Sequence, residues 1–207
     1  MFHNNSTAFY TDGMTKVKTR TPSTMIGPEV LRAAVAILDD EGPDGFTVRA
    51  IARRAKVAPM AIYNHFDGVN GVLEALWIEG FQKLRSAITF QSLNAEQDLL
   101  DAALGYRSFA MANRGLYTVM FMHRFRNFEP SLEAAQLAAS TYVTLVVGVE
   151  RCQELGFFTH SRASDAAQVI WSGCHGYVSL ELLGINFAAD HKATFELLLS
   201  TLRDGFR

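Results

Sequence analysis

The sequence is poor in the features that mark secreted and membrane proteins. It has two cysteines among 207 residues, Cys152 and Cys174, which share no metal-type spacing and lie in apolar surroundings. We therefore expect two buried thiols in a reducing compartment rather than a disulfide. The first 20 residues lack an apolar core that would indicate a secretory signal. The longest near-apolar run, Tyr142 to Val149, is far shorter than the roughly 20 residues of a membrane helix. These observations predict a cytoplasmic protein that contacts no membrane.

Motifs for catalysis are also missing. We find no nucleophile elbow, phosphate-binding loop, dinucleotide glycine pattern, zinc motif or paired-carboxylate arrangement. The sequence therefore predicts neither an enzyme nor a cofactor. A metal site built from His123, Glu150 and His175 stays open as an alternative, but no ligand spacing supports it.

What is present is ample apolar material for a packed core. Hydrophobic residues make up 49% of the chain, with 15 Phe and only 5 Pro. The net charge of −2 hides an asymmetry, because residues 14–66 hold eight Lys or Arg against five acids, whereas residues 67–207 hold eleven against fifteen. A basic front on an acidic body suits a DNA-reading head, although charge alone does not exclude a chance fluctuation.

Helical periodicity runs through the whole chain, and no alternating strand pattern competes with it. We expect an all-α fold of about nine helices, with a polar tail before them. The first helix opens at Gly27-Pro28 and the second near Thr47; the third opens at Pro59 and a longer fourth covers about 69–88. Later helices are expected near 95–113, 115–124, 130–155, 163–185 and 190–204.

The most informative stretch runs from Phe46 to Phe66. A helix-turn-helix needs a support helix, a tight turn and a short recognition helix whose first part enters the major groove of DNA. Val48, Ile51 and Ala52 would pack the support helix inward, and Val57 would fill the turn. Ile62 and Phe66 would pack the third helix, so its remaining residues face outward: Ala58, Pro59, Met60, Ala61, Tyr63 and Asn64.

These residues resemble the tetracycline-repressor (TetR) family of bacterial regulators. The resemblance covers about residues 28–80 and is carried by the apolar face from Val30 to Leu38, by Gly45-Phe46-Thr47-Val48-Arg49, by Ile51-Ala52, Ala55 and Val57, and above all by Ile62-Tyr63-Asn64-His65-Phe66. It implies a ligand-responsive DNA-binding transcriptional regulator, most often a repressor that a small apolar or aromatic effector releases from DNA.

The resemblance also implies roles for individual residues. Thr47 and Arg49 correspond to positions that touch phosphate or a base edge, and Tyr63 and His65 to phosphate-binding positions. Met60, Ala61 and Asn64 would face the bases. The full set of expected DNA-binding residues is Thr47, Arg49, Lys56, Pro59, Met60, Ala61, Tyr63, Asn64, His65 and Asn70.

Two departures from the family pattern weaken the expected grip on DNA. Met60-Ala61 stands where many members have a polar or Gly residue followed by Thr, and Val69 stands where many have a phosphate-binding Lys. Non-specific affinity should therefore be modest, since phosphate neutralisation drives it. The basic residues Lys16, Lys18 and Arg20 could compensate as an arm on the DNA, or the tail could have no such role.

The rest of the chain is less diagnostic, apart from Trp171-Ser172-Gly173-Cys174-His175-Gly176. A Trp, three residues and His-Gly resemble the signature of one C-terminal subclass of these regulators. Trp171 and His175 share a helix face. Gly173 and Gly176 would let another helix approach closely.

The middle of the chain, rich in aromatic residues and Met, is the expected effector pocket, with plain core packing as the alternative for each residue. Its expected residues are Phe109, Tyr117, Met120, Phe121, His123, Phe125, Val146, Glu150, Trp171 and His175.

The last two helices carry more apolar residues than a monomer needs, and the resemblance implies that they pair with a second copy. The expected interface residues of this homodimer are Val169, Val178, Leu182, Phe195, Leu198, Leu199 and Leu202. Burial within the monomer is the alternative.

Together these inferences divide the chain into a flexible tail (1–24), a helix-turn-helix domain (25–70) and a ligand-binding and dimerisation domain (71–207). The expected partners are a palindromic double-stranded DNA operator, a small-molecule effector and a second copy of the chain. An enzyme and a helical binding protein that has lost DNA binding are the rival classes, and activation rather than repression stays open.

Overall fold

A computed structural model describes residues 23–90 and 92–206, and every regular element in this part of the chain is helical. The all-α prediction is therefore confirmed. The helices are α1 (Ser23–Asp40), α2 (Val48–Ala55), α3 (Pro59–Phe66), α4 (Val69–Ala87), α5 (Ala95–Ala112), α6 (Arg114–Tyr117), α7 (Leu132–Glu154), α8 (Ala163–Leu182) and α9 (His191–Gly205). A short 3-10 turn, η1 (Pro43–Gly45), and a π-helical turn, η2 (Thr118–Met122), complete the set.

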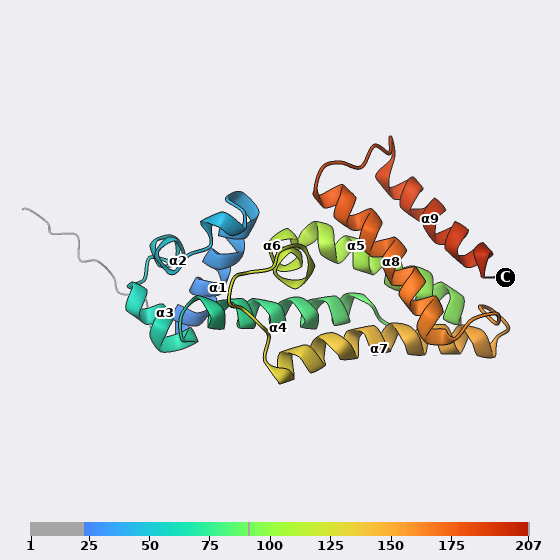
Figure 1. Ribbon diagram of the computed structural model, residues 1–207, viewed down its shortest axis with the longest axis horizontal. Helices are drawn as coiled ribbons and strands as arrows, with labels where there is room; N and C mark the ends of the chain where they lie inside the picture. The colour runs from blue at the N-terminus through green and yellow to red at the C-terminus, as the bar shows by residue number, and fades with distance from the viewer. Residues whose placement is uncertain (1–22, 91, 207) are drawn as a thin grey trace, which may run out of the picture.

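The helices form an elongated molecule with a small head at one end (Figure 1). Helices α1 to α3 make this head, and α4 runs from it into the larger bundle of α5 to α9. Helix α7 lies along one side of α4, and α9 is the outermost helix, packed against α8. A single helix thus belongs to both parts of the molecule.

Local chemistry sets the ends of the short head helices. The Thr47 hydroxyl caps α2 by accepting a hydrogen bond from the Ala50 backbone N–H at 3.2 Å. Lys56 and Asp67 end α2 and α3 in the left-handed conformation, each with φ of 56°. Both turns lie just before the predicted starts of the third and fourth helices, at Pro59 and about residue 69, so the bihelical geometry follows from local signals.

Thr47→Ala removes this cap and leaves the backbone donor without its partner. We expect a loss of about 1 kcal/mol in unfolding free energy. Urea denaturation measures it, and Thr47→Ser, which keeps the hydroxyl, should restore most of the loss. An unchanged midpoint in the alanine variant would contradict a stabilising cap.

Two predicted boundaries were wrong. Helix α1 begins at Ser23 and contains Pro28, which removes one backbone hydrogen bond near the start of the helix without ending it. The expected helix over 115–124 is instead a single α-helical turn followed by the π turn η2, which ends at Met122. Single π turns of this kind often lie at functional sites.

The apolar residues gather into two cores that share elements. The head core holds buried residues of α1, α2 and α3 together with Val72, Leu73 and Leu76 of α4. It also takes in Leu116 of α6 and Val119 of η2. The body core joins α5, α7, α8 and α9 to the second half of α4. Helix α4 and the α6–η2 segment therefore pack into both cores.

Both cysteines are buried free thiols, as expected. Burial raises the pKa of Cys152 to about 11 and that of Cys174 to about 12, so both stay protonated. Among the described residues, α7 is the one helix long and apolar enough, by length and composition, to cross a membrane. It packs against α4, α5 and α8.

Candidate functional site

The outer face of the head is formed by the start of α2, the turn after it and α3. Ile62 is fully buried and fixes α3 against α1 and α2. Met60 and Tyr63 then project outward, with 64% and 52% of their surfaces exposed. The other predicted DNA-binding residues on this face are also exposed, apart from the partly buried Ala61: Thr47, Arg49, Lys56, Pro59, Asn64 and His65.

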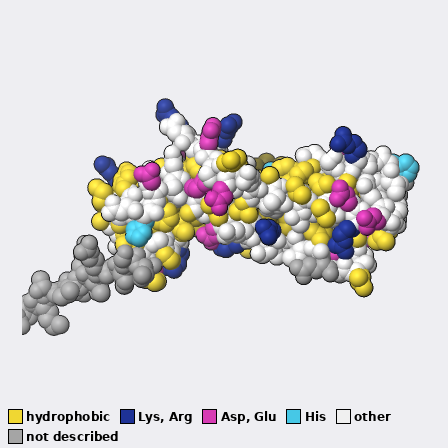
Figure 2. Space-filling model, turned by 90° about the horizontal axis from the view of Figure 1, so that it is seen from below, with side chains coloured by type: hydrophobic (Ala, Val, Ile, Leu, Met, Phe, Trp, Pro, Cys, Tyr) yellow, Lys and Arg dark blue, Asp and Glu magenta, His cyan; other side chains and the backbone are white. Residues whose placement is uncertain are grey.

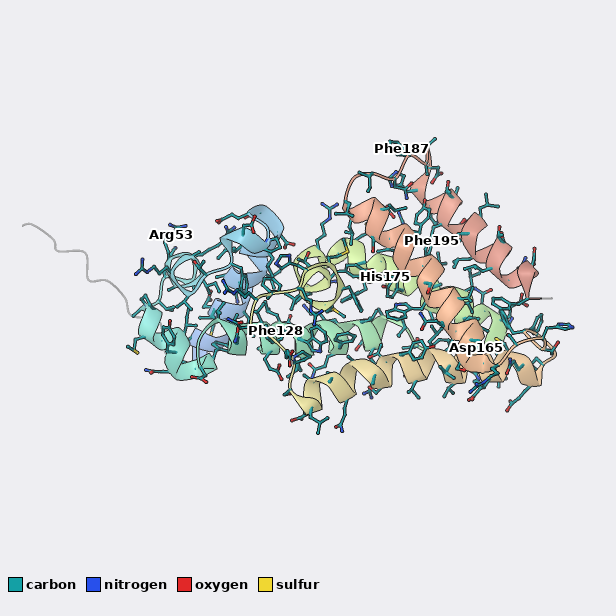
Figure 3. The ribbon with its side chains drawn as sticks, in the orientation of Figure 1. Arg53, Phe128, Asp165, His175, Phe187 and Phe195 are labelled. Atoms are coloured by element: carbon teal, nitrogen blue, oxygen red, sulfur yellow. The ribbon has the colours of Figure 1, made fainter. Side chains whose placement is uncertain are left out.

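The basic side chains of this outer face lie on α2 and the turn after it, where Arg49, Arg53 and Lys56 are exposed. Figure 2 shows scattered Lys and Arg side chains on the head, with hydrophobic side chains between them. Arg54 is engaged in ion pairs with Asp40 and Glu41. Arg53, which sequence reasoning did not single out, is exposed on α2 and extends away from the head (Figure 3). The one sequence signal for Arg53 as a DNA-binding candidate is its position on the helix face opposite the buried residues.

Asn70, the remaining predicted DNA-binding residue, is exposed at the start of α4. Its side-chain amide donates a hydrogen bond to the backbone carbonyl of Asn127 at 2.9 Å, so it ties α4 to the segment before α7. The possible basic arm, Lys16, Lys18 and Arg20, lies outside the described residues.

A cavity of about 340 Å³ lies in the body between α4, α5, η2, α7 and α8. Its walls are almost entirely apolar and include no charged side chain. Trp77, Phe81 and Leu84 line it from α4, Met120 and Phe121 from η2, and Trp171 and Cys174 from α8. The other lining residues are Ile88, Phe90, Leu99, Ala102, Ala103, Tyr106, Ala138, Ala139, Thr141, Tyr142, Leu145 and Ile170.

The structure places three of the ten residues predicted for the effector pocket on the wall of this cavity. Met120, Phe121 and Trp171 line the cavity, whereas the remaining predicted residues do not: Phe109, Tyr117, His123, Phe125, Val146, Glu150 and His175. Phe109 and Tyr117 are core residues, and His123 and Glu150 are exposed. Phe125 packs against Phe46 of the head, with ring centroids 5.5 Å apart.

His123, Glu150 and His175 do not form the alternative metal site. No group of three or more metal-ligating side chains comes together in the described part of the chain. His175 is instead engaged with two tyrosines.

Three polar atoms meet beside the cavity wall. The Tyr106 and Tyr117 hydroxyl oxygens lie 2.8 Å apart, and they lie 2.9 and 2.8 Å from His175 Nδ1. His175 sits on α8 where that helix passes α5 and α6 (Figure 3). Burial raises the pKa of both tyrosines and lowers the pKa of His175, which favours three uncharged groups.

Helix α4 connects the cavity to the head through its own side chains. Its residues Trp77, Phe81 and Leu84 line the cavity, while Val72, Leu73 and Leu76 belong to the head core. The Trp77 indole N–H also donates to the Ala134 carbonyl of α7 at 3.3 Å. A ligand that moved Trp77 would therefore press on the helix that carries the head.

The α6–η2 segment makes a second connection. Asp39 of α1 accepts a hydrogen bond from the Gly115 backbone N–H at 2.7 Å, and Leu116 and Val119 are buried in the head core. One turn on, Met120 and Phe121 line the cavity. Met120 also packs against Gly80 of α4, where an added Cβ would lie 2.5 Å from its sulfur.

Helices α8 and α9 expose only part of the surface predicted for a dimer. Val178, Phe195 and Leu199 are buried in the body core, which makes them wrong as interface residues. Leu182 and Leu198 pack on the same core, and Leu202 packs against Gly173, as that glycine's lack of a side chain allows. Val169 is exposed as expected. The other exposed apolar residues on these helices and their connecting loop are Leu180, Leu183, Ile185, Phe187 and Leu197.

An ion-pair cluster holds α8 and α9 to α5. The Arg107 guanidinium donates two hydrogen bonds to the Glu181 carboxylate, at 2.8 and 2.5 Å. His191 Nδ1 lies 3.1 Å from the same carboxylate, and the Tyr177 hydroxyl donates to the His191 carbonyl at 2.9 Å. Glu181 thus joins three helices.

Two models of known protein families match the chain. Residues 30–76 match a model described as bacterial regulatory proteins of the tetR family. Residues 99–202 match one described as a tetracyclin repressor-like C-terminal domain. The chain belongs to the TetR family of transcriptional regulators. Both the head and the body of this TetR-family chain are therefore assigned independently, and DNA binding through the helix-turn-helix follows from that membership.

Individual relatives agree. The chain is 26% identical over 187 residues to an uncharacterized HTH-type transcriptional regulator of Mycobacterium tuberculosis, covering 89% of this chain and 83% of that protein. A tetR-family regulatory protein from Rhodococcus RHA1 superposes with a TM-score of 0.72 at 20% identity, covering 86% and 95% of the two chains. A TetR variant from Acinetobacter baumannii, solved in complex with minocycline, has a TM-score of 0.60 at 24% identity, covering 86% and 93%.

Proposed function

We propose that this regulator is a repressor, that it binds its operator as a homodimer, and that a small, largely apolar effector releases it. The observation that carries the proposal is a cavity whose walls include three residues of α4, the helix whose first half packs into the DNA-binding head. We retain the division into head (25–70) and body (71–207), with the protein acting in the cytoplasm.

The exposed face of α3 would enter the major groove, as in other helix-turn-helix proteins. Asn64 would read a base edge, with Met60 and Ala61 in apolar contact with thymine methyl groups. The phosphates would be contacted by Tyr63, His65, Thr47, Arg49 and Lys56. Pro59 would place the start of α3 against the DNA backbone. We add Arg53 to this set because it is exposed on α2.

Asn64→Ala and Tyr63→Phe should affect DNA binding in different ways. Losing a base contact should weaken operator binding about tenfold and leave binding to a scrambled duplex unchanged. Losing a phosphate contact should weaken binding to both duplexes by a similar, few-fold factor. Fluorescence anisotropy measures both. An Asn64→Ala variant that keeps full preference for the operator would contradict base reading by this residue.

The effector should be uncharged, because the cavity of about 340 Å³ has no charged lining residue. Trp77, Phe81, Phe121 and Trp171 give it an aromatic lining that suits a planar molecule. The Acinetobacter relative, which was solved with minocycline, supports a small-molecule role for the body.

Release would work through two states of the dimer. With the heads about 34–36 Å apart, two recognition helices reach successive major grooves. An effector that displaces Trp77 or Met120 would shift α4 or α6–η2 and change that spacing. A coupling of about 1–3 kcal/mol is enough to alter occupancy many-fold.

Small molecules selected by quenching of Trp77 and Trp171 fluorescence test this coupling. Each compound is added to the operator complex, and its effect on anisotropy is measured. We expect compounds that bind the cavity to weaken operator affinity at least fivefold. A compound that saturates the cavity and leaves operator affinity unchanged would contradict release by this route.

The dimer would form through the exposed apolar residues of α8 and α9. These are Val169, which the sequence also predicted, with Leu180, Leu197 and, just after α8, Leu183. They replace the buried Val178, Phe195 and Leu199 of the predicted set. Sedimentation of Leu183→Glu, compared with the wild-type chain, tests this interface. The fully exposed Phe187, at 98%, extends the same surface into the connecting loop.

A further inference from the structure

We infer that the effector carries a hydrogen-bond acceptor, such as a carbonyl oxygen, and that Tyr106 is the donor that recognises it. This inference rests on the proposed function, since it assigns a chemical class to the ligand of the same cavity. The two hydroxyl oxygens of Tyr106 and Tyr117 and the Nδ1 atom of His175 form a triangle of close contacts, and the positions of their protons decide which group can donate to a ligand.

The three groups do not hold enough protons for a hydrogen bond between each pair of them. Each neutral hydroxyl supplies one proton, and His175 Nδ1 carries either a proton or a lone pair. If Nδ1 is unprotonated, only the two hydroxyl protons are available for the three close contacts. One pair of atoms then faces lone pair to lone pair at 2.8 or 2.9 Å.

A proton on Nδ1 removes that repulsion. Nδ1–H then donates to one hydroxyl oxygen, and one hydroxyl donates to the other. One hydroxyl proton is left over, and it must point out of the triangle. Burial lowers the pKa of His175, so the ring is neutral and the proton on Nδ1 is its only one.

The surplus proton belongs to Tyr106. Tyr117 is fully buried and does not line the cavity. The Ser179 hydroxyl beside Tyr117 lowers the pKa of that tyrosine through a side-chain hydrogen bond, so it donates to the Tyr117 oxygen rather than taking up its proton. Tyr106 does line the cavity, so its proton has a route to a ligand.

The other N–H and O–H hydrogens of the cavity wall are engaged elsewhere, that of the Trp171 indole with the Tyr106 hydroxyl oxygen and three more with backbone carbonyls. The Trp77 indole donates to Ala134, the Tyr142 hydroxyl to Ser164 and the Thr141 hydroxyl to Leu137. The Tyr106 hydroxyl is held in place from behind by Tyr117 and His175. A preoriented donor in an apolar cavity selects for an acceptor, because an unpaired buried donor costs free energy on binding of an apolar ligand.

Two probes of the same shape test the inference. In 2-acetylnaphthalene a carbonyl oxygen stands where 2-isopropenylnaphthalene has a methylene group, and quenching of Trp77 and Trp171 reports the binding of either. The wild-type protein should bind the ketone about three- to tenfold more tightly than the alkene. Tyr106→Phe should abolish this preference by weakening ketone binding alone.

Tyr117→Phe is the matched control. It removes the hydroxyl that does not reach the cavity, and the ketone preference should survive. A second readout is the infrared carbonyl stretch of the bound ketone, which should lie at lower frequency in the wild-type protein and in Tyr117→Phe than in Tyr106→Phe. Such a shift reports a hydrogen bond to the carbonyl and is not produced by a general loss of packing.

Equal affinity for ketone and alkene in the wild-type protein would overturn the inference and leave the effector cavity standing. A ketone preference that survives in Tyr106→Phe, or an unshifted carbonyl stretch, would overturn it in the same way. Failure of both probes to bind up to their solubility would overturn the effector cavity as well.

Discussion

Replacing Gly71 with alanine should destabilise the head more than a Gly-to-Ala substitution at any other glycine that packs there. An added Cβ would lie 1.5 Å from the backbone carbonyl oxygen of Phe66, at the junction of α3 and α4. A backbone atom cannot rotate away, so the two helices must separate. We expect a loss at or above the upper end of the roughly 1–3 kcal/mol typical of overpacking. Operator affinity should fall more than tenfold because α3 loses its placement.

Thermal denaturation and operator titration measure the two effects. Gly205→Ala is the matched control, since its added methyl group meets no atom within 4 Å and the residue is also helical. Its stability and DNA binding should match those of the wild-type chain. Wild-type operator affinity in Gly71→Ala would contradict the close α3–α4 junction.

Glu181→Gln should give the second large effect. The substitution keeps the shape of the side chain but removes the carboxylate charge that the Arg107 guanidinium binds directly, and only 19% of the Arg107 side chain is exposed. We expect a loss of about 2 kcal/mol in unfolding free energy, below the roughly 3–5 kcal/mol for breaking a fully buried pair. Glu196→Gln, whose partner Lys192 is highly exposed, should cost less than about 0.5 kcal/mol.

The same pair predicts a pH dependence. Burial alone would raise the pKa of Glu181, but hydrogen bonds from Arg107 and His191 outweigh it and hold the pKa below its usual value. The stabilisation is therefore present above the unfolded-state pKa of about 4.3 and is lost as the pH falls through the lower folded-state value. Urea titrations from pH 7 to pH 3 should show the wild type and Glu181→Gln converging at the acid end. A constant difference between them would contradict the ion pair.

The head could be predicted from sequence because its signals are local. Thr47 caps α2, Lys56 and Asp67 mark the turns, and Ile62 and Phe66 repeat at helical spacing. Each signal acts within a few residues, so their order along the chain is enough to give the fold. Pro28 misled the prediction because a proline near the start of a helix removes only one hydrogen bond.

The cavity could be predicted only in part, since contacts between distant segments define it. Trp171 and Phe121 were found from their residue types. Tyr106 was missed because nothing near it in sequence shows that its hydroxyl meets Tyr117 and His175, 11 and 69 residues away. Phe125 was misplaced because the chain turns away after η2 and carries it to Phe46 of the head.

The residues predicted for the dimer interface show that composition alone does not tell which apolar residues face a partner. Val178 and Phe195 are apolar and lie on the predicted helices, yet they face the body core rather than a partner. A hydrophobic helical face indicates burial but does not say against which surface. Only the placement of α5 beneath α8 decides which side of each helix stays exposed.

The most direct test of the repressor proposal is fluorescence anisotropy of the full chain on its own upstream intergenic DNA and on a scrambled duplex, at several salt concentrations. We predict tighter binding to the intergenic DNA, with the logarithm of the binding constant falling linearly as the logarithm of the salt concentration rises. No binding to either duplex at low salt would contradict a DNA-reading head and favour a binding protein that senses its ligand without DNA.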